Sequence, residues 1–294
     1  MATSNCLVAF IDILGFKNLV DDYFSGKDKT SLKVINNALK EANEFGISYA
    51  KNHLKKYDIS FKFKQFSDCV SISMPIVQQN HHSFLTIIAA FINVIRVYNI
   101  ILLENGIIVR GAISIGNHFE NTRTIFSQGL ISSYILESQK AIYPRVIIDK
   151  KVIEIINQTI KEYSEEYGNF YSFCGNSFIK DWDDEIFVSP FKIFEGFNNS
   201  NENIDPMFSQ VIDFLKRRYK IKITLSDLKA FLLNPDNEKD LLFKLLKKEK
   251  EIISQLTTEK GEIILKHKWL SEFLKWNVSP NESRIKFEHY FIPI

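Results

Sequence analysis

The sequence predicts an α+β protein in which one sheet carries helices on one face, followed by a helical C-terminal region. Apolar runs typical of strands alternate with longer segments of helical spacing, in the order strand, helix, hairpin, helix, strand, strand, helix, strand, helix. With 294 residues and 45% hydrophobic content, the chain can also bury a large core.

The first elements are a strand, a helix and a hairpin. Leu7–Ile13 is an apolar run that ends before a glycine, which predicts a buried strand. Residues 27–56 carry apolar side chains at helical spacing. Residues 59–66 and 69–75 both alternate and are separated by only a Ser and an Asp, which predicts a hairpin.

The next helix, Ser83–Leu103, is long and apolar enough to span a membrane. Asn93, Arg96 and Asn99 interrupt it, and their spacing places them on one helical face. This pattern favours a helix buried inside a soluble protein, so no membrane partner is expected.

The elements of the middle region are shorter. Glycines bound the apolar strand 106–116, and 123–126 is a short extended segment. We expect a helix at 127–138, a strand at 145–149 and a helix at 150–163.

The C-terminal part changes character. Residues 185–194 form the last expected strand, and Glu195–Pro206 is polar and turn-rich, as in a linker. Met207–Trp276 has an almost wholly helical pattern with Lys and Glu on its outer faces. The predicted organisation is therefore one domain at 1–195 and a mostly helical region of unknown role at 206–294.

Charge and cysteine content narrow the partners and the compartment. The net charge of +2 gives no reason to expect an obligate nucleic-acid partner. Cys6, Cys69 and Cys174 lack zinc-site spacing, which favours a reducing cytosol. No basic segment precedes the first apolar run, and Asp12 interrupts that run, so we expect no targeting segment and a cytoplasmic location.

Two carboxylates suggest a metal site. Asp12 lies in an otherwise apolar strand, where a carboxylate is costly unless it is neutralised. Asp68 lies at the turn of the predicted hairpin. If strand and hairpin are neighbours, the two side chains can face each other, and such hard oxygen ligands suit Mg²⁺. For either residue alone, the alternative is an ordinary turn or capping role.

Other residues could bind anions. The turn at Gly15 allows backbone amides to approach an anion. Arg110 in an apolar strand needs a partner, either a phosphate or a neighbouring carboxylate. Lys64 and Lys62 lie on one strand face and could bind an anion. The alternative is that this face is simply exposed to solvent. The histidines show no metal-ligand spacing and no P-loop is present, so metal-assisted phosphoryl chemistry is the catalysis that several residues jointly support.

Three motifs resemble the class III nucleotide cyclase homology domain, in the same order and strand contexts. They are "FIDILGF" (Phe10–Phe16), similar to F-x-D-I-x-G-F, "KQFSD" (Lys64–Asp68), similar to K-x-x-G-D with Ser67 replacing Gly, and "RGAISIG" (Arg110–Gly116), similar to R-x-G-I-x-x-G. The resemblance covers about residues 5–190. It implies a ferredoxin-like, palm-type cyclase sheet.

The resemblance also implies roles for individual residues. Two Mg²⁺ or Mn²⁺ ions would lie on Asp12 and Asp68, with the Ile13 carbonyl as a further ligand. The family's sites are shared across a dimer, so a homodimer is expected. By the same correspondence phosphate would meet the amides of Gly15 and Phe16, Arg110 and Lys180, and the base would meet Lys64 and Thr124.

The sequence also departs from the family. Ile131 and Ile135 stand where the family has an Asn and, four residues later, an Arg that steadies the transition state. Another residue must then supply that charge, and Arg123 is near in sequence; otherwise the enzyme is slow or its substrate differs.

A divergent branch fits the motifs better. The opening motif, the "SD" hairpin and the "RGAIS" strand resemble the bacterial pyrimidine cyclases of Pycsar anti-phage systems. The resemblance implies conversion of UTP or CTP to cyclic UMP or cyclic CMP, a second messenger for a separate effector protein. Bulky neighbours of Lys64, such as Phe63 or Phe66, could fill the space that a smaller base leaves.

Three alternatives remain open. Lys64 and Thr124 could read adenine in a purine (adenylate) cyclase. A palm-type oligonucleotide synthase would share the two-Asp plan. A catalytically inactive nucleotide-binding module that signals through the helical tail is favoured by Ile131 and Ile135.

Overall fold

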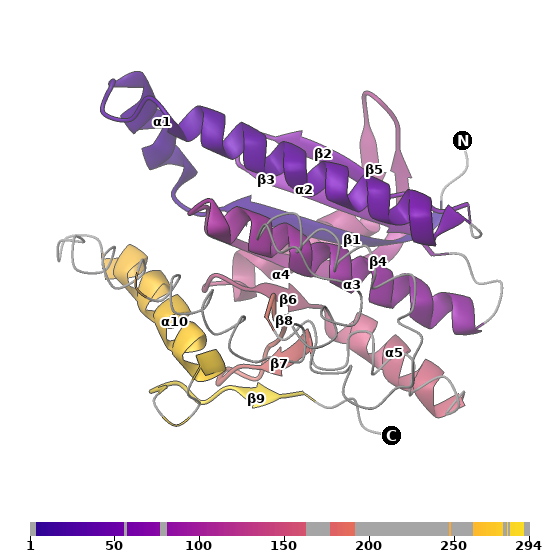
Figure 1. Cartoon of the computed structure of the whole chain (residues 1–294). Coiled ribbons are helices and arrows are strands. Elements are labelled where there is room, and N and C mark those ends of the chain that lie inside the picture. Colours follow the sequence, from indigo (N-terminus) through magenta and orange to yellow (C-terminus); the bar gives the residue numbers. More distant parts are fainter. Residues whose placement is uncertain are drawn as a thin grey trace, which may run out of the picture.

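A computed structural model describes residues 4–55, 58–76, 81–162, 177–191, 247, 261–278, 281 and 283–290. Its described strands form one mixed sheet in the order β2-β3-β1-β4-β6-β8-β7-β9, and β5 pairs with β4 off this path (Figure 1). The strands are β1 (Ser4–Ile13), β2 (Lys62–Phe66), β3 (Cys69–Pro75), β4 (Val109–Glu120), β5 (Ile125–Ser127), β6 (Val146–Ile148), β7 (Phe178–Lys180), β8 (Ile186–Val188) and β9 (Glu288–His289). The helices are α1 (Phe16–Phe24), α2 (Ser31–His53), α3 (His81–Glu104), α4 (Gln128–Lys140), α5 (Lys150–Glu162) and α10 (Gly261–Val278).

The first four strands have the predicted ferredoxin-like arrangement. β1 is central and pairs antiparallel with both β3 and β4, while β2 pairs with β3. The chain crosses from β1 to β2 through α1 and α2, and from β3 to β4 through α3. The α+β class is confirmed, because each long element that the periodicity predicts is present up to α5.

Helices cover one face of the sheet, as predicted. α2 and α3 run side by side across it (Figure 1). The odd-numbered residues of β1, from Leu7 to Ile13, share one apolar core with α2, α3 and α5. Because successive strand residues point to opposite faces, the even-numbered residues, Asp12 among them, face away from this core.

α3 is a core helix whose polar residues are used internally. By length and composition Phe84–Glu104 could cross a membrane, but 89% of its most apolar window is buried inside the protein. The buried guanidinium of Arg96 donates to the carbonyl oxygens of Ser189 (3.0 Å) and Phe191 (2.7 Å), and contacts Asn93. Arg96 of α3 therefore binds the backbone of the segment that follows β8.

α4 lies against the opposite face, on β1 and β4. The Ser127 hydroxyl caps it by accepting from the Leu130 N–H at 2.9 Å. Its buried residues are Gly129, Ser133 and Glu137, spaced by four. Gly129 permits a close approach, since a Cβ built there would lie 2.9 Å from the Val8 side chain. α4 therefore packs through small and polar residues.

The C-terminal elements extend the sheet at the edge formed by β7 and pack on β8. β9 pairs with β7, and α10 packs through Trp269 and Phe273 on β8. The Trp269 indole N–H donates to Asp181 at 2.9 Å, and Asp181 and Asp183 both contact the fully buried Arg145. α10 confirms the helical prediction for this part of the tail.

The remaining predictions for the C-terminal half have different outcomes. Residues 195–206 and 207–246, where a linker and the first part of the helical region are predicted, lie outside the described residues. The single late strand predicted at 185–194 is shorter than expected: β8 covers Ile186–Val188 only. β7 and β9, three and two residues long, were not predicted, because so short a run carries no periodic signal.

Candidate active site

The sheet places three of the site's side chains in one row. Asp12 of β1 lies directly opposite Cys69 of β3 on one side and Arg110 of β4 on the other. Residues paired in this way point to the same face of a sheet. The row therefore lies on the face that α4 covers, near the end of β1.

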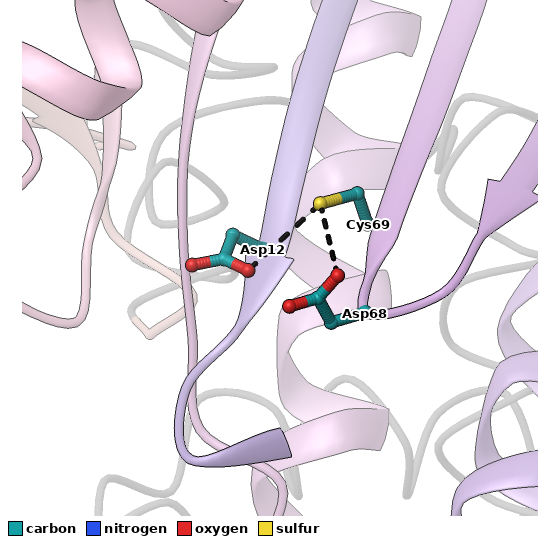
Figure 2. Close-up of side chains that lie close together, drawn as sticks. All are labelled: Asp12, Asp68 and Cys69. Atoms are coloured by element: carbon teal, nitrogen blue, oxygen red, sulfur yellow. Dashed lines mark hydrogen bonds between the residues drawn. The ribbon is translucent and has the colours of Figure 1, made fainter. Parts of the chain in front are cut away.

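Asp68 joins this row from the β2–β3 turn. Its carbonyl oxygen accepts from the Ile13 N–H at 2.9 Å, which ties the turn to the end of β1. Figure 2 shows the carboxylates of Asp12 and Asp68 at neighbouring strand ends, with the Cys69 thiol close to both. One ligand atom from each of the three residues lies within 4.8 Å of the others. The hairpin therefore brings the two aspartates together.

The backbone at Ser67, where the sequence departs from the cyclase pattern, is left-handed. Ser67, at the glycine position of K-x-x-G-D, has φ 56°. This left-handed backbone favours glycine, and Ser adopts it at a cost. A glycine at position 67, as in the motif, would avoid this cost.

Cys69 is a thiol between two acids. Its Sγ lies 3.5 Å from Asp68 Oδ1 and 3.9 Å from Asp12 Oδ1. Burial, followed by the charges of Asp68 and Asp12, raises the pKa of Cys69 to about 12. At neutral pH it is therefore a protonated, weak hydrogen-bond donor.

Arg110 neutralises the carboxylate in the apolar strand. Its Nε donates to Asp12 Oδ2 at 3.0 Å and lies 2.7 Å from Glu137 Oε1 of α4. Asp12 is 15% exposed and Glu137 only 3%. Burial raises the pKa of Glu137, and Arg110 offsets part of that rise. The partner of Arg110 in this structure is thus a pair of carboxylates.

The turn after β1 presents backbone donors. Gly15 has φ 76° and ψ 11°, a left-handed conformation that glycine adopts freely, and α1 begins at Phe16. The first amides of a helix lack intrahelical acceptors and favour anions. This turn directly follows Asp12 and Ile13, so those amides begin next to the acidic pair.

The predicted base-reading residues form a second, separate group. The Lys64 Nζ donates to the carbonyl oxygens of Asn121 (3.3 Å) and Thr122 (2.9 Å), in the turn between β4 and β5. The Thr124 N–H donates to the Asn121 side chain in that same turn. The turn lies at the end of β4 opposite to Arg110, so the second group is distant from the acidic pair.

Two aromatic neighbours of Lys64 lie on different faces. Phe66 alternates with Lys64 on the same strand face and is 40% exposed. Phe63 points to the helix side, where it stacks on Tyr98 with ring centroids 6.3 Å apart. Of the two, only Phe66 shares the face of Lys64.

Other predicted residues lie away from the acidic pair. Lys180 is on β7, where its Nζ pairs with Asp184. β7 is four strands from β1, roughly 19 Å at the usual strand spacing. Ile131 and Ile135 point outward from α4 and are 59% and 44% exposed. Arg123 is an exposed residue of the β4–β5 turn.

Glu137 and Cys69 were not predicted as members of the site. The hairpin pairs Cys69 with Phe66, whereas its pairing with Asp12 is between β3 and β1, which are not consecutive, so the sequence does not set that register. Glu137 carries no sequence signal either, because its position depends on which face of α4 meets the sheet.

Comparison with known proteins gives distant structural likenesses. No protein-family model matches the chain, and no curated protein matches it at a significant level. The chain is similar to a class III adenylyl cyclase-like ATP-binding protein from Pseudomonas aeruginosa (10% identity, TM-score 0.37), over 52% of this chain and 34% of that one.

It is also similar to the catalytic core of a rhodopsin-guanylyl cyclase with converted specificity (13% identity, TM-score 0.39; 64% of this chain, 97% of that one). A bacterial light-regulated adenylyl cyclase is similar at 12% identity and TM-score 0.34, over 72% of this chain and 56% of that one. The chain thus spans about a third of the length of the first of these proteins. With TM-scores below 0.5, the function must be inferred from the residues of the site.

Proposed function

We propose that the chain is a nucleotide cyclase that converts a nucleoside triphosphate to its 3′,5′-cyclic nucleotide and pyrophosphate. The observation that carries the proposal is the convergence of Asp12 and Asp68 from different elements, with Arg110 in the same row. A carboxylate pair beside an arginine and the start of a helix can bind a cation and a phosphate together.

The donor set fits two Mg²⁺ or Mn²⁺ ions. Asp12 and Asp68 offer carboxylate oxygens within 4.8 Å. The resemblance to the class III cyclases adds the Ile13 carbonyl as a further candidate ligand. When bound, such ions would make the ribose 3′-hydroxyl more acidic and neutralise charge on the triphosphate.

The chain's own residues have binding and orienting roles. Arg110 would bind a phosphate through its guanidinium, and the amides of Gly15 and Phe16 would bind another oxygen of the triphosphate. The 3′-oxygen attacks the α-phosphorus and loses its proton, while the bond from the α-phosphorus to the bridging oxygen breaks and pyrophosphate leaves. Lys180 is carried over from the family pattern as a further phosphate-binding residue; because β7 lies four strands from β1, it would have to come from the partner chain of a shared site.

Two features support a homodimer with shared sites. Lys64 and Thr124 lie apart from Asp12 and Asp68, as two half-sites would. α4 presents exposed Ile131, Tyr134 and Ile135, an apolar surface that a second copy could cover. Mixing Asp12→Asn chains with Lys64→Ala chains should then restore part of the activity, because one composite site would be intact. An active enzyme that stays monomeric at assay concentration would contradict the dimer.

The resemblance to the Pycsar cyclases supplies the substrate and the role. The base would be a pyrimidine, with Phe66 reducing the space beside Lys64. The product would be a cytoplasmic second messenger that activates a separate effector protein in anti-phage defence. We expect UTP or CTP to be preferred over ATP by about tenfold or more. A dominant cyclic AMP product from an equal mixture of the four nucleotides would contradict this preference.

The decisive experiment is incubation with each nucleoside triphosphate and MnCl₂, followed by mass spectrometry of the products. A cyclic mononucleotide would support the proposal, and a linear or cyclic oligonucleotide would indicate a synthase. Asp12→Asn and Asp68→Asn should each abolish turnover while the fold is retained. Glu44→Gln, on the exposed surface of α2, is the matched control and should be fully active.

An inactive nucleotide-binding module is the second candidate. The outward orientation of Ile131 and Ile135 favours it, because the described α4 supplies no cation to the site from those positions. Binding of nucleotide without any product, in the presence of Mn²⁺, would support this candidate.

A further inference from the structure

Glu137 is a buried carboxylate that the proposed metal site does not use. It is the last of the three buried residues on α4, and its side chain is 3% exposed. A buried charge is retained only with a partner, and the cation that it contacts is Arg110. Glu137 is therefore an ion-pair partner of Arg110 and not a solvated residue of the helix surface.

Arg110 is shared unequally between two acids. Its Nε carries one hydrogen, which points to Asp12 Oδ2 at 3.0 Å. Glu137 Oε1 is closer, at 2.7 Å, but accepts no hydrogen bond of acceptable geometry from the residues that the structure describes. Arg110 thus holds Glu137 by charge alone, and Oε1 is an acceptor ready for the same N–H.

The sharing matters when a cation reaches Asp12. One oxygen of Asp12 faces Cys69 and Asp68, and the other is bound to Arg110. A site for two ions needs both oxygens, and even one ion competes with the charge of Arg110. Arg110 is only 26% exposed and needs another carboxylate once Asp12 is engaged.

We propose that Glu137 is the positioning residue that takes Arg110 from Asp12 when a divalent cation binds, and that keeps Arg110 beside the site for the triphosphate. The inference rests on the proposed function, because it assumes a cation on Asp12. In this proposal the Glu137 carboxylate of α4 releases Asp12 from Arg110, so that Asp12 can bind the cation.

The test is a double-mutant cycle measured as Mn²⁺ affinity by electron paramagnetic resonance, without nucleotide. Glu137→Gln keeps the shape but leaves Asp12 as the only described carboxylate in contact with Arg110. We expect Mn²⁺ binding to weaken about tenfold, within the usual range for residues that support a metal ligand. In an Arg110→Met background, the same Glu137→Gln change should alter the affinity less than about twofold. Glu137→Asp, which keeps the charge, should retain most of the wild-type affinity and serves if the Gln variant does not fold.

Each outcome has a distinct meaning. Unchanged Mn²⁺ affinity in Glu137→Gln overturns the inference and leaves the metal site intact. An equal loss in both backgrounds also overturns it, because Glu137 would then act directly on the ion by its charge. If the wild-type protein binds no Mn²⁺, the metal site of the proposed function fails, and the inference fails with it.

Discussion

Replacing Arg145 with Met should cost about 3–5 kcal/mol of unfolding free energy, the usual cost of removing one partner from a buried ion pair. The Arg145 and Asp181 side chains are fully buried, and Asp183 is 23% exposed. Met fills a similar volume but, among the described residues, leaves the Asp181 carboxylate with only the Trp269 indole and the Trp182 amide as donors. The loss is therefore mainly electrostatic.

The penalty should depend on pH in one direction. Burial raises the pKa of Asp181, and Arg145 opposes this rise. Without Arg145 the folded variant binds a proton at Asp181 more readily than the unfolded chain does. Its deficit should therefore grow as pH rises above 3.8, the ordinary pKa of an aspartate, and shrink in acid, where neutral Asp181 needs no cation.

Urea unfolding followed by circular dichroism measures both effects. Lys40→Met removes a cation from an exposed pair with Glu44 and should cost less than about 1 kcal/mol, which makes it the matched control. Adding Asp181→Asn to Arg145→Met should recover part of the loss. A loss below about 1 kcal/mol for Arg145→Met, or strictly additive losses in the double variant, would refute the reasoning.

Three further predictions concern the site and its supports. Ser67→Gly should stabilise the protein by about 0.5–1 kcal/mol in urea unfolding, because glycine removes the left-handed strain at φ 56°; destabilisation would contradict this. Iodoacetamide at pH 8 should label Cys69 about a thousandfold more slowly than an ordinary thiol, since its pKa is about 12 and not 9.0; labelling at the ordinary rate, by residue-resolved mass spectrometry, would exclude that pKa. Gly116→Ala should cost about 1–3 kcal/mol, because the new Cβ would lie 2.8 Å from the backbone nitrogen of Gly129; an unchanged urea midpoint would show that α4 can move away.

Much of the fold follows from the sequence because its elements are long and periodic. The α+β class could be predicted since β1, the hairpin and β4 have apolar runs and the connecting helices are long. The ferredoxin-like order of the strands was expected only from the resemblance to the class III cyclases. α1 was missed because nine residues without a side-chain cap give a weak helical signal.

The site was predictable only in part. The approach of Asp12 to Asp68 could be predicted, because a hairpin next to β1 places its turn at the end of that strand. The position of Glu137 could not, because apolar periodicity would turn Ile131 and Ile135 inward, whereas α4 buries Gly129, Ser133 and Glu137. Which face of a helix is buried depends here on close backbone approach and on one ion pair, which are tertiary properties.

The pairing of β9 with β7 has a consequence for synthesis on the ribosome. All the residues of the acidic site, up to Glu137, are synthesised before β7, whereas Trp269, which binds Asp181, and β9, which pairs with β7, are synthesised much later. At about 5–20 residues per second, Trp269 is synthesised on the order of ten seconds after Asp181, the carboxylate that its indole binds. The nascent chain therefore carries a nearly complete ferredoxin-like half beside the edge of β7, which lacks its partner strand until β9 has been synthesised.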